Sequence, residues 1–337
     1  MSDTPSPERT YKHQVPAEVF IEAFTTIEWT PEQTEKFNAL GIVRLRGIEL
    51  RNSSVNLDYW HFEDSEEFTL LNNAKVIGDI TINEITTEVP HWCIYQSKLS
   101  NVSLQNDSRK VINSSAPEPL MFRTNIYVWG SNIANVDISN CLIGVLNLIK
   151  NKITGHFHIK KTTIENCLVS DSVNQAFRIF DDSVVKKLTV NTCTIEYFRI
   201  SKSVVKDFEI SEKSTIENLN IIRNSFIGKL NIEESAVKFS TLKNSTLVKF
   251  NVNNFDSDIL NLNNCALRNF DIESCTINDF EIVSSTINVL YFQNSKAQSL
   301  ILERVFTDLT LDHVTINTCF LESCFFIRVV FTKQLLN

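Results

Sequence analysis

The sequence predicts an all-β solenoid, a parallel right-handed β-helix in which the chain winds in coils of about 20 residues. A ten-residue repeat runs through residues 183–302. Its apolar positions have the spacing of strands and not that of helices. Only 7 Gly and 7 Pro occur beside 23 Phe, and 43% of the chain is hydrophobic, so the chain is a folded one rich in strand formers.

The repeat is seen when the chain is written in tens. Successive tens read SVVKKLTVNT, CTIEYFRISK and SVVKDFEISE, and later CALRNFDIES, CTINDFEIVS and STINVLYFQN. A small residue begins each ten, and apolar residues follow two, five and seven positions later. Apolar residues at i and i+2 share one face of a strand, and the two or three polar residues between such pairs are too few for a helix. Short strands joined by corners must therefore wind into coils, whose parallel ladders stack.

The same pattern names the side chains that should face the interior. A small residue alternates with a large one, as packing in a narrow tube requires. The predicted inward set includes Ser183, Val185, Leu188, Val190, Cys193, Ile195, Phe198, Ile200, Phe208, Cys265, Phe270, Cys275, Phe280, Ile282, Ser285, Leu290 and Phe292, and it ends with Cys319, Leu321, Cys324, Phe326, Val329 and Phe331.

These five-residue units resemble those of pentapeptide-repeat proteins. In that family a small residue precedes the central Leu or Phe by two positions, and the units CALRN, CTIND, STINV and STLVK have a small residue two positions before their central Leu or Ile. The units between them, such as FDIES and FEIVS, place Phe where the family usually has Ala. The resemblance covers residues 131–331 and implies a right-handed quadrilateral β-helix of about ten coils. A square coil and a flatter or wider one are both compatible with these units. Some relatives by this resemblance imitate duplex DNA and bind type II topoisomerases.

Three regions follow one another along the chain. Residues 1–40 are expected to be a tail and a helical cap, because Thr30, Pro31 and Glu32 form a helix start and Gly41 can end that helix. Residues 41–130 keep the spaced apolar pattern less regularly and are predicted to form irregular coils with protruding loops. Residues 131–337 form the regular solenoid and an end for association.

Two surface clusters are candidates for binding. If Phe157 and Ile159 point inward, the side chains between and around them point outward, and Arg178 and Arg199 follow at one-coil intervals. His158, Arg178 and Arg199 would then form a column that could bind a carboxylate or a phosphate. The candidate anion-binding or partner-binding residues are His156, His158, Lys160, Arg178 and Arg199. The second cluster is an acidic and aromatic loop for a protein partner, formed by Asp58, Tyr59, Trp60, Glu63, Asp64, Glu66 and Glu67. An ordinary solvated face and an ordinary solvated loop are the alternatives.

The C-terminal end has no polar cap in its sequence. We expect it to pair with a second copy of the chain and form a two-fold homodimer, because an apolar solenoid end must be covered. The residues of this predicted dimer end are Phe325, Phe326, Val329, Val330, Phe331, Leu335 and Leu336.

Charge and cysteine usage limit the partners. Net charge is −8, but residues 131–337 hold 22 acids and 21 bases, which argues against a general phosphate-binding surface and against direct nucleic-acid binding. No cofactor motif occurs, and no third metal ligand is evident beside His156 and His158. None of the eight cysteines forms a CxxC pair, so buried reduced thiols in a cytoplasmic protein are expected. The chain shows neither a secretory signal nor an apolar run long enough to cross a membrane.

The function predicted from these observations is that of a non-enzymatic scaffold, a rigid rod that engages an unidentified protein partner. Two alternatives stay open. One is a polysaccharide-acting β-helix enzyme, for which paired carboxylates such as Asp271 and Glu281 would serve. The other is a DNA-mimicking protein that binds topoisomerases, which would need columns of acids along the rod.

Overall fold

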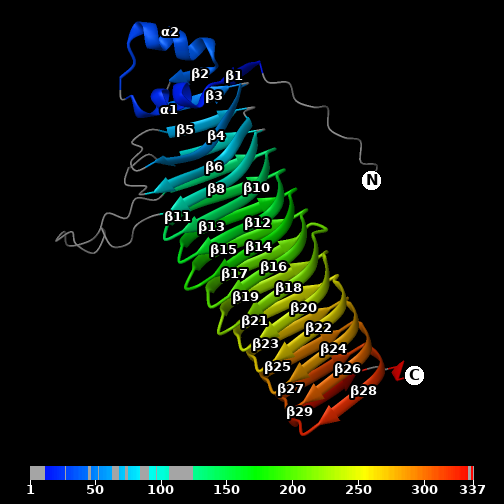
Figure 1. Cartoon of the computed structure of the whole chain (residues 1–337). Helices are drawn as coiled ribbons and strands as arrows, with labels where there is room; N and C mark the ends of the chain where they lie inside the picture. Colours follow the sequence, from blue (N-terminus) through cyan, green and yellow to red (C-terminus); the bar gives the residue numbers. More distant parts are fainter. Residues whose placement is uncertain are drawn as a thin grey trace, which may run out of the picture.

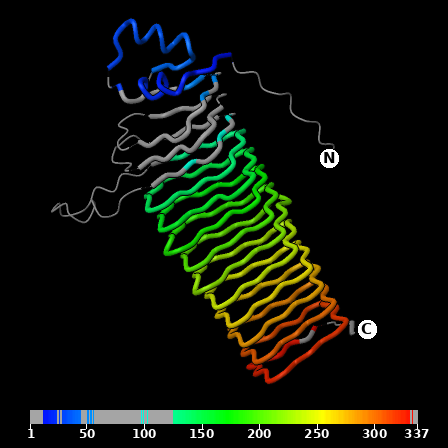
Figure 2. Tube along the Cα trace, viewed as in Figure 1, coloured from blue at the N-terminus to red at the C-terminus, as the bar shows by residue number. Residues whose placement is uncertain are grey.

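The structure of the chain is a computed structural model. It describes residues 12–26, 28–44, 47–51, 53–62, 68–72, 75–83, 91–95, 97–105, 124–332 and 335–336. The described chain is a long rod of stacked coils, with two helices at one end and the last strands at the other (Figure 1). Figure 2 shows the coils of residues 124–332 as a trace that advances steadily along the rod. The predicted all-β parallel solenoid is confirmed.

Each coil contributes one strand to each of two sheets. From β3 onward, strand n pairs with strand n+2, so successive strands alternate between sheet B and sheet A; before that, β1 pairs with β4 and β2 with β3. All described ladders are parallel apart from the antiparallel β2–β3 pair. Sheet A contains β1 His13–Val15, β4 Ser53–Phe62, β6 Lys75–Asn83, β8 Lys98–Gln105, β10 Asn132–Ser139, β12 Lys152–Lys160, β14 Val173–Phe180, β16 Thr194–Ser201, β18 Thr215–Ile222, β20 Ala236–Lys243, β22 Asp256–Asn263, β24 Thr276–Val283, β26 Lys296–Glu303, β28 Thr315–Glu322 and β30 Leu335–Leu336.

Sheet B has the same number of strands. It contains β2 Ile42–Arg44, β3 Gly47–Arg51, β5 Phe68–Asn72, β7 His91–Tyr95, β9 Thr124–Trp129, β11 Leu142–Ile149, β13 Thr163–Ser170, β15 Val184–Asn191, β17 Val204–Ser211, β19 Phe226–Glu233, β21 Thr246–Asn253, β23 Ala266–Glu273, β25 Thr286–Gln293, β27 Phe306–Asp312 and β29 Phe325–Thr332.

The N-terminal end is closed by the helices α1 Ala17–Thr25 and α2 Pro31–Ala39. Helix α2 begins as predicted, because the Thr30 side chain accepts the backbone N–H of Gln33 and the Gln33 side chain accepts that of Thr30. The chain turns out of it at Gly41, whose φ is +78°. Phe20 of α1 and Phe37 of α2 are fully buried, so the helices form part of one continuous core with the first coils.

The strands are longer than the five-residue units suggest. Each regular strand has about eight residues and spans two units, as in β16, where Ile195, Phe198 and Ile200 are buried. Two outward residues follow one another in its middle, Glu196 and Tyr197, so the strand changes direction there without leaving the sheet. The ladder omits the first of these two positions, since Ile195 pairs with Ile216 and Tyr197 with Asn218. Only every second predicted corner is therefore a tight turn.

The tight corners between strands use the left-handed backbone region. In the described chain, 22 residues other than glycine have positive φ, and they recur at these corners. Inter-coil hydrogen bonds hold them, as when the N–H of Asn264 donates to the carbonyl of Val283 at 3.0 Å. Extra residues are absorbed here too, because Asp181–Asp182, Glu212–Lys213 and Arg223–Asn224 each place two left-handed residues at one corner. Each doubled corner adds one residue to the ten-residue repeat.

A ladder of small polar side chains lies just inside the corners. The Ser285 hydroxyl donates to the carbonyl of Val283 at 2.8 Å and accepts the N–H of Cys265, one coil away, at 3.0 Å. The same arrangement recurs with Ser295 and Cys275. The inward serine therefore satisfies two backbone groups that the corner leaves unpaired, which explains a small polar residue at a buried position.

Stacked aromatic rings fill the wide part of the core. The rings of Phe157, Phe177 and Phe198 follow one another at centroid distances of 5.1 Å. Phe208 and Phe280, which the repeat places inside, are both 1% exposed. The predicted inward set is buried in the regular coils.

The last coil departs from that pattern. Cys319 and Leu321 occupy inward positions, in register with the buried Leu300 and Leu302, yet they are exposed. The reason is positional, because these side chains end the stack and no later described coil covers them. Val329 is exposed for the same reason, while Cys324 and Phe326 are half-buried.

Candidate functional site

The predicted column of basic side chains exists on the outer face of sheet A. The strand register places His158 of β12 beside Arg178 of β14, and Arg178 beside Arg199 of β16. Each of these side chains lies between two buried residues of its strand, so it points outward by the alternation of the strand. The register brings His158, Arg178 and Arg199 into one column, whereas His156 and Lys160 pair with Ala176 and Phe180 of β14. The role of these residues in binding stays a prediction.

The column begins one coil earlier with a carboxylate that the sequence reasoning missed. Asp137 of β10 pairs with His158 in the ladder. Its Oδ1 lies 3.0 Å from His158 Nδ1, and its Oδ2 lies 3.1 Å from His156 Nε2. Both oxygens of one carboxylate therefore engage two imidazole rings.

A bulge in β12 brings the second histidine to this place. Strand β12 has one residue more than its neighbours, and its register with β10 shifts by one residue between Ile153 and Phe157. Gly155 lies within the bulge, where a Cβ atom would come within 2.1 Å of the Asn135 Oδ1. That oxygen accepts the His156 N–H at 3.0 Å. The absence of a side chain at Gly155 thus permits the hydrogen bond that fixes His156.

The two imidazoles form a compact pair. Their ring centroids are 4.0 Å apart and the rings are inclined by 20°. The edge of Phe180 packs against the His158 ring at 5.4 Å. Burial first, and then the charge of His156, hold the pKa of His158 below its ordinary value, against the opposing effect of Asp137. His158 is therefore largely neutral at pH 7, and its Nε2 is buried without a hydrogen-bond partner.

Cationic side chains continue the column beyond the histidines. The guanidinium of Arg178 packs over the ring of Tyr197 at 5.4 Å. Lys160 forms an ion pair with Asp181 at 3.4 Å and lies over the Phe180 ring. Arg178 and Arg199 thus present adjacent positive charges, whereas the charge of Lys160 is already balanced.

Further along the rod the column loses its charge. In register order, the outward residues after Arg199 are Asn220, Thr241, Asn261, Glu281, Ile301 and Phe320. The amide of Asn261 donates to Glu281, which ties one coil to the next. The column is therefore cationic near β14 and apolar near β28, and it holds no continuous row of acids.

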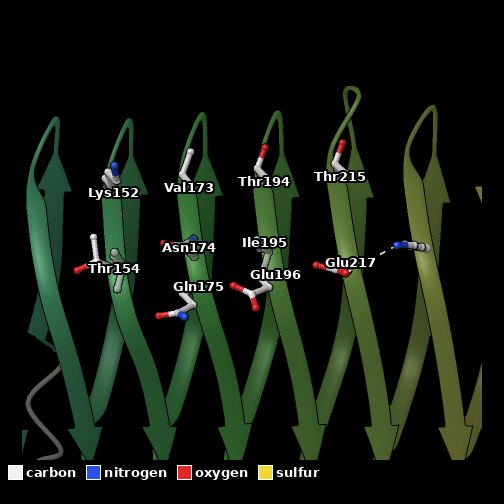
Figure 3. Close-up of a pocket in the computed structure, with 12 residues that line it drawn as sticks. Lys152, Thr154, Val173, Asn174, Gln175, Thr194, Ile195, Glu196, Thr215 and Glu217 are labelled. Atoms are coloured by element: carbon white, nitrogen blue, oxygen red, sulfur yellow. Dashed lines mark ion pairs between the residues drawn. The ribbon is translucent and has the colours of Figure 1, made fainter. Parts of the chain in front are cut away.

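A shallow groove of about 730 Å³ runs across the first halves of the sheet A strands. Figure 3 shows two rows of outward side chains along it, one with Lys152, Val173, Thr194 and Thr215, and the other with Thr154, Gln175, Glu196 and Glu217. Glu217 forms an ion pair with Lys238 at 3.9 Å. The lining combines lysine, threonine, amide and glutamate side chains, so the groove offers a mixed polar surface.

Most residues of the predicted partner loop lie wholly or partly outside the described residues. Asp58, Tyr59 and Trp60 belong to β4, but their side chains lie outside the described set, and so do Glu63, Asp64, Glu66 and Glu67 altogether. The carboxylates proposed for glycosidic chemistry do not share a face, because Asp271 is in sheet B and Glu281 is in sheet A.

The predicted dimer end is an exposed apolar surface. Phe325 is 62% exposed and Val329 39%, while Phe326 and Val330 are half-buried. Three residues that the sequence reasoning did not include extend this surface, namely Phe320, Leu321 and Ile327. The side chains of Phe331, Leu335 and Leu336 lie outside the described set, although their strands do not. We call Phe320, Leu321, Phe325, Ile327 and Val329 the open end.

Comparison of the chain with protein-family models, with curated proteins and with solved structures finds no match. In the described part of the chain, no helix has the length and hydrophobicity that a membrane crossing requires.

Proposed function

We propose that this chain is a non-enzymatic scaffold, a rigid β-solenoid rod of the pentapeptide-repeat kind that pairs with a second copy and carries a charged column for a protein partner. The observation that carries this proposal is the open end, where the last described coil leaves both inward and outward apolar side chains exposed. Phe320, Leu321, Phe325 and Ile327 are each more than half exposed there. Contiguous apolar surface of this kind marks an interaction site in most proteins.

A second copy of the chain is the occupant that the geometry favours. The two ends of the rod differ, because α1 and α2 close the N-terminal end. Head-to-tail stacking would have to place the open end against that closed cap. A two-fold contact instead sets two identical open ends against each other, and each covers the apolar side chains of the other. In the described chain β29 is the last strand of sheet B, so its outer edge is also available for pairing.

The column supports a protein partner over the alternative partners. Arg178 and Arg199 are neighbours and could engage carboxylates of a partner's side chains. A DNA mimic would need acids in regular succession, and the sheet A column instead mixes amides, hydroxyls and charges of both signs. A glycoside hydrolase would need two facing carboxylates, and Asp271 and Glu281 are in different sheets. The scaffold proposal requires neither feature.

Sedimentation velocity of the full chain tests the proposal. The wild-type chain should sediment as a dimer at micromolar concentration, and Leu321→Lys with Ile327→Lys should sediment as a monomer. The matched control is Phe226→Lys, because Phe226 is an exposed phenylalanine on the side of the rod at 38% exposure. Unchanged circular dichroism would show that the variants fold. A wild-type chain that stays monomeric at 100 μM, or a control that dissociates as readily as the variant, would contradict the proposal.

A further inference from the structure

Three potential metal ligands converge on the outer face of sheet A, away from the open end. One nitrogen of His156, one of His158 and a carboxylate oxygen of Asp137 all lie within 4.8 Å of one another. They come from two neighbouring strands, β10 and β12, of the regular solenoid. Ligands on strands are held more precisely than ligands on loops.

The chemistry of the donors favours a particular class of ion. Two imidazoles and one carboxylate suit Zn²⁺ and similar divalent transition metals, whereas Mg²⁺ and Ca²⁺ prefer oxygen donors alone. Zn–N and Zn–O bonds of about 2.0–2.2 Å need the donors closer together than 4.8 Å. His156 and Asp137 have side-chain exposures of 35% and 47%, so small rotations can bring their donor atoms inward.

One local feature supports a built site. The bulge at Gly155 gives β12 an extra residue, and it brings His156 to the same face as His158 and Asp137. The nitrogen of His158 that faces Asp137 is Nδ1, so the ion would bind there and the ring proton would be on Nε2.

The neighbouring cations do not block this position. Arg178 pairs with His158 from the side of β14, whereas Asp137 pairs with it from the side of β10. The Arg178 guanidinium is further engaged with Tyr197 in β16, one coil beyond. Lys160 is paired with Asp181. Arg178 and Lys160 thus have partners outside the group of three donor atoms.

We propose that Asp137, His156 and His158 form a site for one divalent transition-metal ion of the zinc type, with water completing the coordination. The ion would lie between the Asp137 carboxylate and the two imidazole rings, where it would replace the two hydrogen bonds that join them. Because the ligands belong to successive coils, the ion would also link β10 to β12 across the sheet.

Calorimetric titration of the tag-free, chelator-treated full chain with ZnCl₂ tests the site. One equivalent should bind to the wild-type chain. His156→Gln and Asp137→Asn should each weaken binding by at least about 100-fold, since even outer-shell partners of a metal are worth about 10–100-fold. Titration with CoCl₂ gives a second readout, because two nitrogen ligands should produce a visible d–d absorption that both variants lose.

The matched control is His313→Gln. His313 also faces an aspartate, with its Nδ1 2.8 Å from Asp312 Oδ1, but no third donor of the described chain joins that pair. This variant should bind Zn²⁺ like the wild-type chain. Circular dichroism must show that all three variants fold. The proposal is overturned if the wild-type chain binds no Zn²⁺ at 100 μM, or if Asp137→Asn and His156→Gln bind it as tightly as wild type.

Discussion

A buried side chain in this solenoid packs between the residues that occupy the same inward position in the coils before and after it. At one inward position of sheet A, Ile153, Asn174 and Ile195 follow one another in register. Asn174 is 1% exposed, and neither its Oδ1 nor its Nδ2 has a hydrogen-bond partner. A buried amide without partners destabilises the folded chain, because it loses its hydrogen bonds to water and gains none.

Asn174→Ile should therefore stabilise the chain. We expect the free energy of unfolding to rise by about 1–3 kcal/mol, the usual cost of an unsatisfied buried polar group. The reverse exchange in the next coil, Ile195→Asn, should lower it by at least a similar amount. Urea unfolding followed by circular dichroism gives both values. A less stable Asn174→Ile would indicate that the amide has a bound water as its partner.

Burial also explains the chemical character of the cysteines. Desolvation raises the pKa of Cys141 and of Cys167 to about 12 and that of Cys275 to about 11. A thiol reacts as its thiolate, so these side chains should be inert near neutral pH. In the corners Cys replaces Ser as a small residue whose sulfur contacts the same carbonyl, as the Sγ of Cys275 does with Glu273 at 3.0 Å. Their expected role as buried thiols fits this arrangement.

At the scale of the strand, the repeat predicts which residues are buried better than it predicts where the tight corners lie. The spacing of apolar residues identifies the buried set because a strand offers only two faces. It does not distinguish a tight corner from a bend within a strand, since both appear as two consecutive outward residues. The structure separates them by backbone conformation, with left-handed residues such as Asn254 and Asn264 only at the tight corners.

The candidate site shows the corresponding limit of the sequence. The histidine pair is visible as neighbouring residues, but Asp137 comes beside His158 only through a register offset of 21 residues. Counting back 20 residues from His158 leads to Ile138, which is buried. The offset depends on the extra residue in β12, and no residue pattern near Gly155 reveals which side of the strand a bulge will turn. Contacts between coils therefore require coordinates wherever one coil has an extra residue.

At the corner before β22, a large residue occupies the position that is usually small, and a small residue occupies the position that is usually aliphatic. Phe255 occupies the small position before β22 and is 1% exposed, and Ser257 occupies the aliphatic position two residues later. Many other corners have the opposite order, as with Cys275 and Ile277. The two residues share one inward face, so we infer that the phenylalanine ring fills volume that Ser257 leaves empty.

A double-mutant cycle tests this compensation. Phe255→Ser alone should cost about 3–5 kcal/mol through the cavity it leaves, and Ser257→Ile alone about 1–3 kcal/mol through overpacking. The double variant should lose clearly less stability than the sum of the two. Phe255→Ser combined with Ile153→Val, several coils away, provides the additive reference. Additive losses for the neighbouring pair, measured by urea unfolding, would argue against shared volume.

For the whole molecule, the two ends have opposite properties. The helices bury Phe20 and Phe37 and close one end, whereas the other presents Leu321 and Phe325 to solvent. Cys319 lies at this open end and is exposed, unlike Cys193 and its counterparts in the regular coils. Burial and the neighbouring Cys324 still raise its pKa, so it should react more slowly than a free thiol.

Labelling of Cys319 with a disulfide reagent should report dimer formation. We expect its reaction rate to fall as the protein concentration rises, because the second copy covers the open end. Leu321→Lys should keep the rate high at every concentration, and Cys319→Ser should abolish that phase. The rate is followed by the release of the chromogenic thiol at pH 8. A Cys319 rate that is the same at 1 μM and at 100 μM would speak against coverage of this residue.

The uniform spacing of the corners in the second half of the rod has a consequence for length. From Ser225 to Ser295 an inward corner residue recurs every ten positions, and each pair of strands pairs only with the pairs before and after it. Insertion or deletion of 20 residues in this stretch would leave every remaining ladder intact and change the separation between cap and open end by about 4.8 Å. The length of the rod can therefore change in steps of one coil, while the helical cap and the open end keep their structures.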